Sequence, residues 1–226
     1  MIIQASQLPS KGWKSGLPES FEMQPFGPKQ FPLLAKAFDT KEMRYLVVDA
    51  LQEVLRIDFG RLSIPDAMAL VLQQRMSITD VAPLTLTWKC PKPIFMYKSG
   101  PSVEHRDEPV LGAEPCDTLC QTDLHMDAFT ILELNSTSVE FDLPRMMNYE
   151  LAQEGTFNWV VAHMGDDFLS NIDKLNASDG MELWARLIAW TRAAKHGILS
   201  DLDTRCPSCG RTSCTSWSVD PSLFMV

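Results

Sequence analysis

The sequence predicts an α+β fold that is mostly helical: a helical body with a small inserted antiparallel β-module and a C-terminal zinc-knuckle-like segment. The spacing of apolar residues has the period of helices, changes to the alternation of strands in the middle of the chain, and then returns. A Cys-Pro-Ser-Cys-Gly motif at residues 206–210 places two thiols where they can bind one metal ion. The chain has 226 residues, 45% hydrophobic and 22% charged, and is long enough to bury a core.

Residues 1–32 predict an extended N-terminal arm. Five prolines and three glycines in this segment leave no room for a long regular element. Five large apolar side chains are nevertheless scattered through it: Trp13, Phe21, Met23, Phe26 and Phe31. We expect such an arm to pack on another surface, which is either the core of its own domain or a neighbouring subunit.

Residues 33–82 predict a helical part made of two helices. The first, over residues 40–57, carries the apolar stripe of an amphipathic helix at Met43, Leu46, Val47, Ala50, Leu51, Val54 and Leu55. The second, over residues 63–76, begins with Ser63 as its cap. A short connection that contains Gly60 indicates an antiparallel pair.

Residues 83–143 predict the β-module. Its first strand, over residues 84–90, alternates in polarity and ends on a cysteine. Residues 91–115 contain Pro, Gly and charged residues and indicate a long insertion. The apolar segment at residues 129–134 is the expected return strand, and residues 138–143 are a candidate third strand.

Residues 144–204 predict a second helical part, and residues 205–226 a Cys-rich C-terminal knuckle. Helices are expected over residues 156–168 and 179–196, and Gly197 fits the C-cap of the latter. We expect all these segments to form one compact unit.

The six cysteines are the candidate metal ligands. They fall into a C-terminal and an upstream group, and the set consists of Cys206, Cys209, Cys116, Cys120, Cys90 and Cys214. In a reducing compartment, clustered cysteines are more often zinc ligands than disulfides. A thiolate-rich zinc site is closed and contributes folding free energy, so we expect a structural zinc ion rather than a catalytic one.

Two arrangements of these ligands are open. In the first, each group holds its own zinc ion, and His105 or His125 completes the upstream site. In the second, thiols of both groups share one tetrahedral site, made by Cys116, Cys120, Cys206 and Cys209. Because two thiolates cannot complete a tetrahedron, we expect the C-terminal pair to be joined by at least one of Cys116, Cys120 and Cys214.

Charge and motifs exclude several classes of function. The net charge of −9 argues against a protein that binds nucleic acid through phosphate contacts, and it suits protein partners. No apolar run is long enough for a membrane helix, and the N-terminus lacks the features of a signal peptide, so we expect no membrane contact and folding in the cytosol. No phosphate-binding loop, serine elbow or kinase signature occurs.

Isolated titratable residues do not change this interpretation. The pair Asp166 and Asp167, the pair Asp201 and Asp203, and histidines such as His163 are typical of solvated helix ends and packed helices. We therefore expect no enzymatic activity.

Several short motifs together resemble the T4-type baseplate hub assembly proteins of contractile-tailed bacteriophages. They are Leu-Pro-Ser-Lys-Gly at residues 8–12, Gln-Arg-Met-Ser at 74–77, Trp-Lys-Cys-Pro at 88–91, Phe-Asp-Leu-Pro at 141–144, and His-Gly-Ile at 196–198 before the knuckle. Proteins of this kind often carry a compact Cys-x-x-Cys in the middle, whereas here the upstream cysteines are spread over a long insertion.

The resemblance implies a structural protein of virus assembly. Its partners would be other phage tail and baseplate proteins in a symmetric multi-subunit assembly. Its location would be the virion, in the tail baseplate or hub, and the host cytoplasm during assembly. The family implies no catalytic residues. The alternatives from other classes are a cytosolic zinc-ribbon adaptor and, with less support from the acidic charge, an enzyme that contains a structural zinc site.

Overall fold

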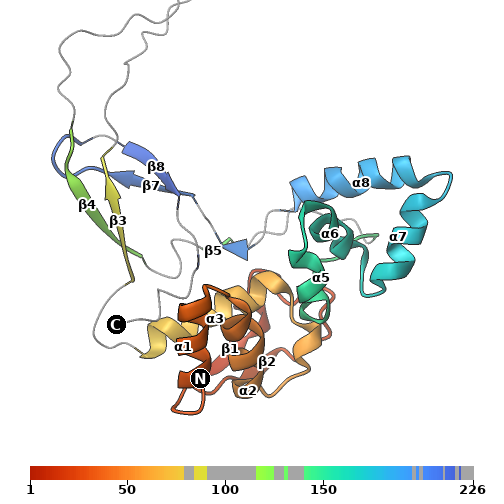
Figure 1. The fold of residues 1–226 in the computed structure, drawn as a ribbon, viewed down its shortest axis with the longest axis horizontal. Coiled ribbons are helices and arrows are strands. Elements are labelled where there is room, and N and C mark those ends of the chain that lie inside the picture. The colour runs from red at the N-terminus through yellow and green to blue at the C-terminus, as the bar shows by residue number, and fades with distance from the viewer. Residues whose placement is uncertain are drawn as a thin grey trace, which may run out of the picture. The chain divides into compact units, whose positions relative to one another are not determined.

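The computed structural model describes residues 1–78, 84–90, 116–124, 130–131, 140–194, 197–198, 201–210, 212–216 and 219. The fold is α+β and mostly helical, as the periodicity predicts, with small antiparallel two-stranded sheets (Figure 1). Its contacts divide the chain into two compact units rather than the one expected. The helical unit comprises Met1–Val81, Met126–Leu199 and Val219–Val226, and the ribbon unit comprises Ala82–His125 and Ser200–Ser218.

The N-terminal segment is part of the core of the helical unit, so the expectation of an extended arm is wrong. Strand β1 (Ile2–Gln4) pairs antiparallel with β2 (Ser20–Glu22), and a 3-10 turn, η1 (Ala5–Gln7), follows β1. Its buried apolar residues include Ile3, Leu8, Phe21, Met23 and Phe26. Prolines and glycines keep the elements short, but burial of these side chains stabilises them without a long helix or strand.

The first helical part has one helix more than predicted. Helix α1 (Phe31–Thr40) begins with a proline in its first turn and ends where Lys41 adopts a left-handed φ of 62°. The predicted helix over 40–57 is a π-helical stretch, η2 (Tyr45–Ala50), that continues into α2 (Leu51–Val54). A 3-10 turn, η3 (Phe59–Arg61), then leads to α3 (Ile64–Ile78), which confirms the predicted second helix.

A buried hydrogen-bonded pair joins the N-terminal segment to α3. The backbone N–H and the hydroxyl of Ser10 donate to the two carboxylate oxygens of Asp66, at 2.8 and 2.6 Å. The backbone N–H of Asp66 donates to Ser63 Oγ at 3.1 Å, so Ser63 caps α3 as expected. Burial raises the pKa of Asp66, and the Ser10 donors oppose that rise.

The second helical part consists of short helices followed by one long helix. They are η4 (Met146–Asn148), α5 (Tyr149–Gln153), α6 (Thr156–Val161), η5 (Ala162–Met164), α7 (Phe168–Asn176) and α8 (Gly180–Ala193). Helix α8 confirms the predicted helix over 179–196, but it ends at Ala193 with Ala194 as its C-cap, so the expected cap at Gly197 is wrong. The predicted helix over 156–168 is divided, because Gly165 has a φ of 106° and Asp167 starts a new helix by accepting from the Ser170 N–H at 3.1 Å.

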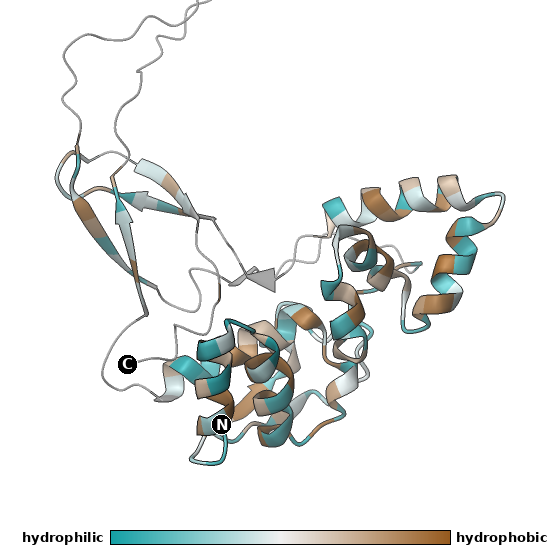
Figure 2. Ribbon diagram, viewed as in Figure 1, coloured by the Kyte–Doolittle hydropathy of each residue, from teal (hydrophilic) through white to brown (hydrophobic). Residues whose placement is uncertain are grey.

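Apolar residues line the interior of the helical unit (Figure 2). Buried Arg145 connects its N-terminal and C-terminal segments, because its guanidinium donates to the carbonyls of Arg61 and Trp13 and pairs with Asp142 at 2.8 Å. Trp13 also stacks on Trp190 with a ring separation of 5.9 Å.

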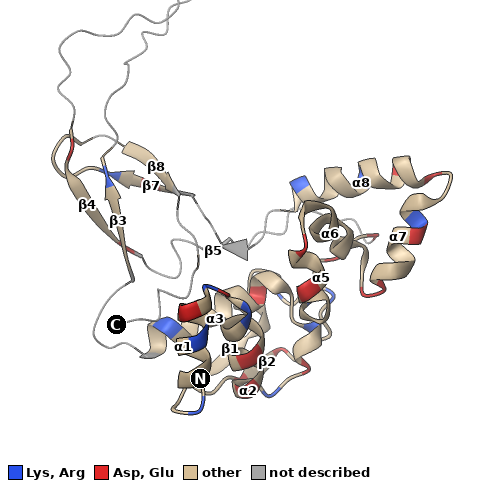
Figure 3. Cartoon of the chain, viewed as in Figure 1, with Lys and Arg blue, Asp and Glu red and all other residues tan. Residues whose placement is uncertain are grey.

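Along the described helices, acidic and basic residues are interspersed (Figure 3). None of these helices is long and apolar enough to cross a bilayer.

The ribbon unit contains two antiparallel hairpins. Strand β3 (Leu84–Lys89) pairs with β4 (Leu119–Leu124), and β7 (Asp201–Arg205) pairs with β8 (Thr212–Ser216). The C-terminal knuckle therefore belongs to the same unit as the first strand of the predicted β-module.

The other predicted strands require correction. The partner of β3 is β4 rather than a strand over 129–134. Within that range the structure describes only β5 (Thr130–Ile131), which pairs with β6 (Gly197–Ile198) in the helical unit. Of the candidate strand over 138–143, residues 138–139 lie outside the described residues, and residues 140–143 form no strand. The strand that pairs with β3 begins at Leu119, earlier in the chain than the predicted segment at 129–134. Polarity alternation alone therefore predicted the wrong segment as the partner of β3.

Candidate metal centre

Both hairpins of the ribbon unit deliver two cysteines in the same way. Cys90 directly follows β3, and Cys116 lies three residues before the first residue of β4. Cys206 directly follows β7, and Cys209 lies three residues before the first residue of β8. Each hairpin therefore places its two thiols at the same end, beyond the paired strands.

The four thiols of these hairpin ends form one cluster. The Sγ atoms of Cys90, Cys116, Cys206 and Cys209 all lie within 4.8 Å of one another. The closest contacts cross between the hairpins: 3.7 Å from Cys90 to Cys209 and 3.7 Å from Cys116 to Cys206. Cys90 and Cys206 are buried, Cys116 is half-buried and Cys209 is exposed. This group can hold a metal ion.

The Cys206–Gly210 turn provides hydrogen-bond donors to a thiolate. The N–H of Gly210 donates to the carbonyl of Cys206 at 2.9 Å, and Gly210 adopts a φ of 70° that favours glycine. The backbone N–H groups of Cys209 and Ser208 donate to the Cys206 sulfur and lower its pKa to about 6. Cys206 is therefore largely a thiolate at neutral pH.

The remaining thiols of the cluster differ in acidity. The Thr118 hydroxyl, 3.2 Å from the Cys116 sulfur, lowers the pKa of Cys116. Burial raises the pKa of the Cys90 thiol to about 12. Because a metal ion binds the thiolate form, an ion at this site must displace the Cys90 proton. Metal binding and proton release are therefore coupled here.

The structure joins the two cysteine groups in one cluster rather than separating them. Compared with the four cysteines that the sequence suggests for a shared site, the cluster has Cys90 in the place of Cys120. Cys214 is exposed on β8, opposite Asp203. His105 and His125 lie outside the described residues. One signal could have identified Cys90: it follows a strand and precedes a proline, as Cys206 does.

Among the described residues of the ribbon unit, each hairpin is held by its backbone ladder and by contacts between its own strands. Trp88 donates from Nε1 to Thr122 Oγ1 at 3.1 Å across β3 and β4, and the Thr204 and Thr215 hydroxyls lie 2.9 Å apart across β7 and β8. The buried cluster of this unit consists of Trp88, Cys90, Cys120 and Cys206. So small a core provides little burial free energy, and cross-linking by an ion would add to it.

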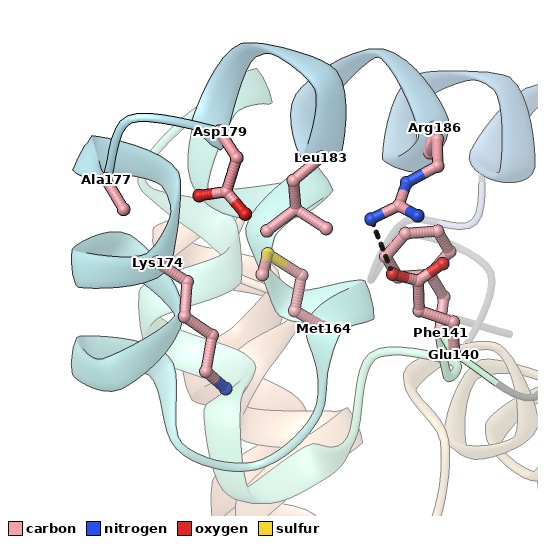
Figure 4. A pocket seen from close by; sticks show the side chains of 8 residues that line it. All are labelled: Glu140, Phe141, Met164, Lys174, Ala177, Asp179, Leu183 and Arg186. Carbon is pink, nitrogen blue, oxygen red and sulfur yellow. Dashed lines mark ion pairs between the residues drawn. The ribbon is translucent and has the colours of Figure 1, made fainter.

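A pocket of about 360 Å³ in the helical unit is another concave candidate (Figure 4). Phe141, Met164 and Leu183 provide its apolar lining. At its rim, Arg186 pairs with Glu140 at 3.0 Å, and Lys174 donates to Asn171 at 3.3 Å. Its lining residues include no nucleophile beside a base, so the cysteine cluster is the stronger site.

Two of the titratable residues singled out in the second helical part, His163 and Asp167, have structural partners. His163 is buried, its Nδ1 lies 2.9 Å from the Trp159 carbonyl oxygen, and its ring packs edge-on against Trp159 and Trp190. Asp167 is the cap of α7.

Comparisons of the chain with protein-family models, with curated proteins and with solved structures found no match.

Proposed function

We propose that this chain is a structural or assembly component of a phage tail baseplate or hub, and that it acts through protein–protein contacts. A structural zinc ion holds its ribbon unit. The cluster of four thiols from two hairpins, all within 4.8 Å of one another, supports the metal centre. The motifs that resemble the baseplate hub assembly proteins support the role in a phage tail.

The spacing of the thiols supports zinc as the ion. A Zn–S bond is about 2.3 Å long, so two sulfurs of a regular tetrahedron lie about 3.8 Å apart. The contacts between Cys90 and Cys209 and between Cys116 and Cys206 are both 3.7 Å. Tetrahedral sites of four sulfur ligands are typical of zinc, and also of iron.

A site of this composition supports a structural role. Four thiolates fill all four positions of a tetrahedral zinc ion and leave none open for a substrate or a water. The ion would instead connect two hairpins that share a small core, so metal binding would contribute to the folding free energy of the ribbon unit.

The motifs that carry the resemblance also have structural partners. Ser10, in the first motif, is bound to Asp66 on α3. Gln74, in the second, accepts from the Phe26 N–H at 3.0 Å and donates to the Gln24 carbonyl at 2.6 Å. Asp142, in the Phe-Asp-Leu-Pro motif, pairs with Arg145. These contacts indicate that the motifs stabilise the fold, which suits a structural protein. A net charge of −9 suits an assembly protein that must stay soluble before it meets its partners.

The test is deletion of the gene from the phage that encodes it, followed by electron microscopy and mass spectrometry of the particles. We expect particles without functional tails, and rescue by the wild-type chain supplied in trans. The double variant Cys206→Ala, Cys209→Ala should fail to rescue, whereas Cys214→Ala, in the same unit, should succeed. Normal infectious particles after deletion would contradict the proposal and favour a zinc-ribbon adaptor with another role.

A further inference from the structure

A fifth thiol lies beside the four-cysteine cluster. Cys120 Sγ lies 3.7 Å from Cys206 Sγ, and the Cys120 residue is 1% exposed. It does not belong to the group of four whose sulfurs lie within 4.8 Å of one another. Because a tetrahedral ion takes four ligands, one of the five thiols must have another role.

The place of Cys120 in the fold distinguishes it from the other four. They lie beyond the paired strands, at the ends of the hairpins, whereas Cys120 lies within β4, opposite Trp88. The ladder of β3 and β4 fixes the backbone of Cys120, and its sulfur lies outside the group of four. The geometry therefore assigns the ligand positions to the four cysteines outside the strands.

The contacts of Cys120 are those of a donor. Its sulfur donates to Cys206 Sγ and has a second acceptor in the Thr118 carbonyl oxygen, at 3.5 Å. A metal-bound thiolate has no proton and could not donate to either atom. Cys206 in turn already accepts from the backbone N–H groups of Cys209 and Ser208, so the Cys120 thiol is a further donor to it, within the buried core of the ribbon unit.

We propose that Cys120 is a positioning residue, whose thiol donates a hydrogen bond to the metal-bound Cys206 thiolate and is not itself a ligand. This inference rests on the proposed function, because it requires the four-thiolate site to hold an ion. A hydrogen bond to a charged acceptor is stronger than one between neutral groups. By withdrawing charge from the sulfur, it makes the thiolate a weaker nucleophile and a poorer electron donor to the ion.

The first test uses the cobalt(II)-substituted protein, whose sulfur-to-cobalt charge-transfer band reports both the number of thiolates and their electron donation. Cys120→Val removes the donor and keeps a similar volume, and Cys120→Ser restores a donor. We expect Cys120→Val to keep the band intensity of four thiolates and to shift the band to longer wavelength. Cys120→Ser should return it toward the wild-type position. The matched controls Cys214→Val and Cys214→Ser should leave it unchanged.

The second readout is the rate at which iodoacetamide alkylates Cys206 in the zinc-bound protein, followed by peptide mass spectrometry. Loss of one ordinary hydrogen bond predicts a rate about fivefold higher in Cys120→Val. Cys120→Ser should remain near the wild-type rate. A purely structural role of Cys120 would not produce rescue by serine in both readouts.

The outcomes separate the two proposals. If wild-type protein binds neither cobalt nor zinc, the proposed metal centre is wrong, and the role of Cys120 with it. If it binds and Cys120→Val changes neither the band nor the rate, only the role of Cys120 is wrong. If Cys120→Ser loses about a quarter of the band intensity, Cys120 is one of the four ligands and the assignment is overturned. Should Cys120→Val fail to fold, Cys120→Ala allows the same comparison with serine.

Discussion

The Sγ atoms of Cys90 and Cys209 lie 3.7 Å apart although 119 residues separate these cysteines in the sequence. Closing so long a loop costs conformational entropy, which grows with the logarithm of its length. The small buried cluster among the described residues of the ribbon unit offsets only part of that cost. An ion held by both hairpins would supply the rest, and this relationship leads to the first prediction.

Protein purified without chelator should contain about one equivalent of zinc per chain. Cys206→Ala should lower this to about a tenth of an equivalent or less, because it removes a ligand, and should make β7–β8 exchange its amide hydrogens faster. Plasma mass spectrometry and hydrogen exchange measure the two effects. Cys214→Ala is the control and should change neither. Wild-type protein without zinc and with all thiols titrating in the native state would contradict the prediction.

The thiolate of Cys206 should titrate far below an ordinary cysteine in protein stripped of metal. Its pKa is lowered from 9.0 to about 6 in the fold. A group with a depressed pKa contributes stability that is complete above its unfolded value and is lost as the pH falls through its folded value. Because the thiolate becomes protonated over the same pH range, thiolate absorbance should show a transition near pH 6 that is missing in Cys206→Ser. A transition that is unaffected by this substitution would assign it to another group.

Loss of the Ser10 hydroxyl should destabilise the helical unit. Ser10→Ala leaves one oxygen of the buried Asp66 carboxylate without this donor, which predicts a loss of about 1–3 kcal/mol in the free energy of unfolding. Burial raises the pKa of Asp66, and loss of the Ser10 hydroxyl, which opposes that rise, should raise it further. Denaturant unfolding measures the loss of stability. Ser178→Ala, at an exposed position, is the control.

Glycine at position 180 should be required where α7 and α8 meet. A Cβ atom there would overlap the carbonyl oxygen of Leu175, and the backbone must move to relieve this contact. We expect Gly180→Ala to lower the free energy of unfolding by about 1–3 kcal/mol, measured by denaturant titration. The neighbouring Ser178→Ala should stay within about 0.5 kcal/mol of wild type. A neutral Gly180→Ala would show that the two helices separate easily.

The N-terminal segment should resist limited proteolysis in the isolated chain. Leu8 and Met23 are fully buried, and β1 pairs with β2. Cleavage of native protein requires local opening, so cuts within residues 1–26 should appear no earlier than global unfolding. Rapid cleavage there, with the rest of the helical unit intact, would restore the hypothesis of an extended arm.

The sequence by itself determined the elements that are specified by local signals, such as a capping residue, an apolar stripe or an alternation of polarity. The helix at 63–76 follows from a capping serine and an apolar stripe, and the first strand follows from polarity alternation. The helix at 179–196 follows from its stripe, although Ala194 rather than Gly197 is its C-cap. The Cys-Pro-Ser-Cys-Gly motif indicated a metal site because its spacing and turn are local properties. The limits of this reasoning show at the N-terminus, where apolar side chains were evident but their burial depends on the helices that cover them.

Tertiary structure alone decided which distant segments meet. The choice of β4 as the partner of β3 depends on pairing across the insertion, and the entry of Cys90 into the cluster depends on a contact across 119 residues. Neither is encoded by a local period. The exclusion of Cys120 from the group of four has the same origin, since its distance from an ion depends on strand register rather than on spacing. The sequence thus identified the cysteines as candidate metal ligands, and the ends of the two hairpins bring four of the six together.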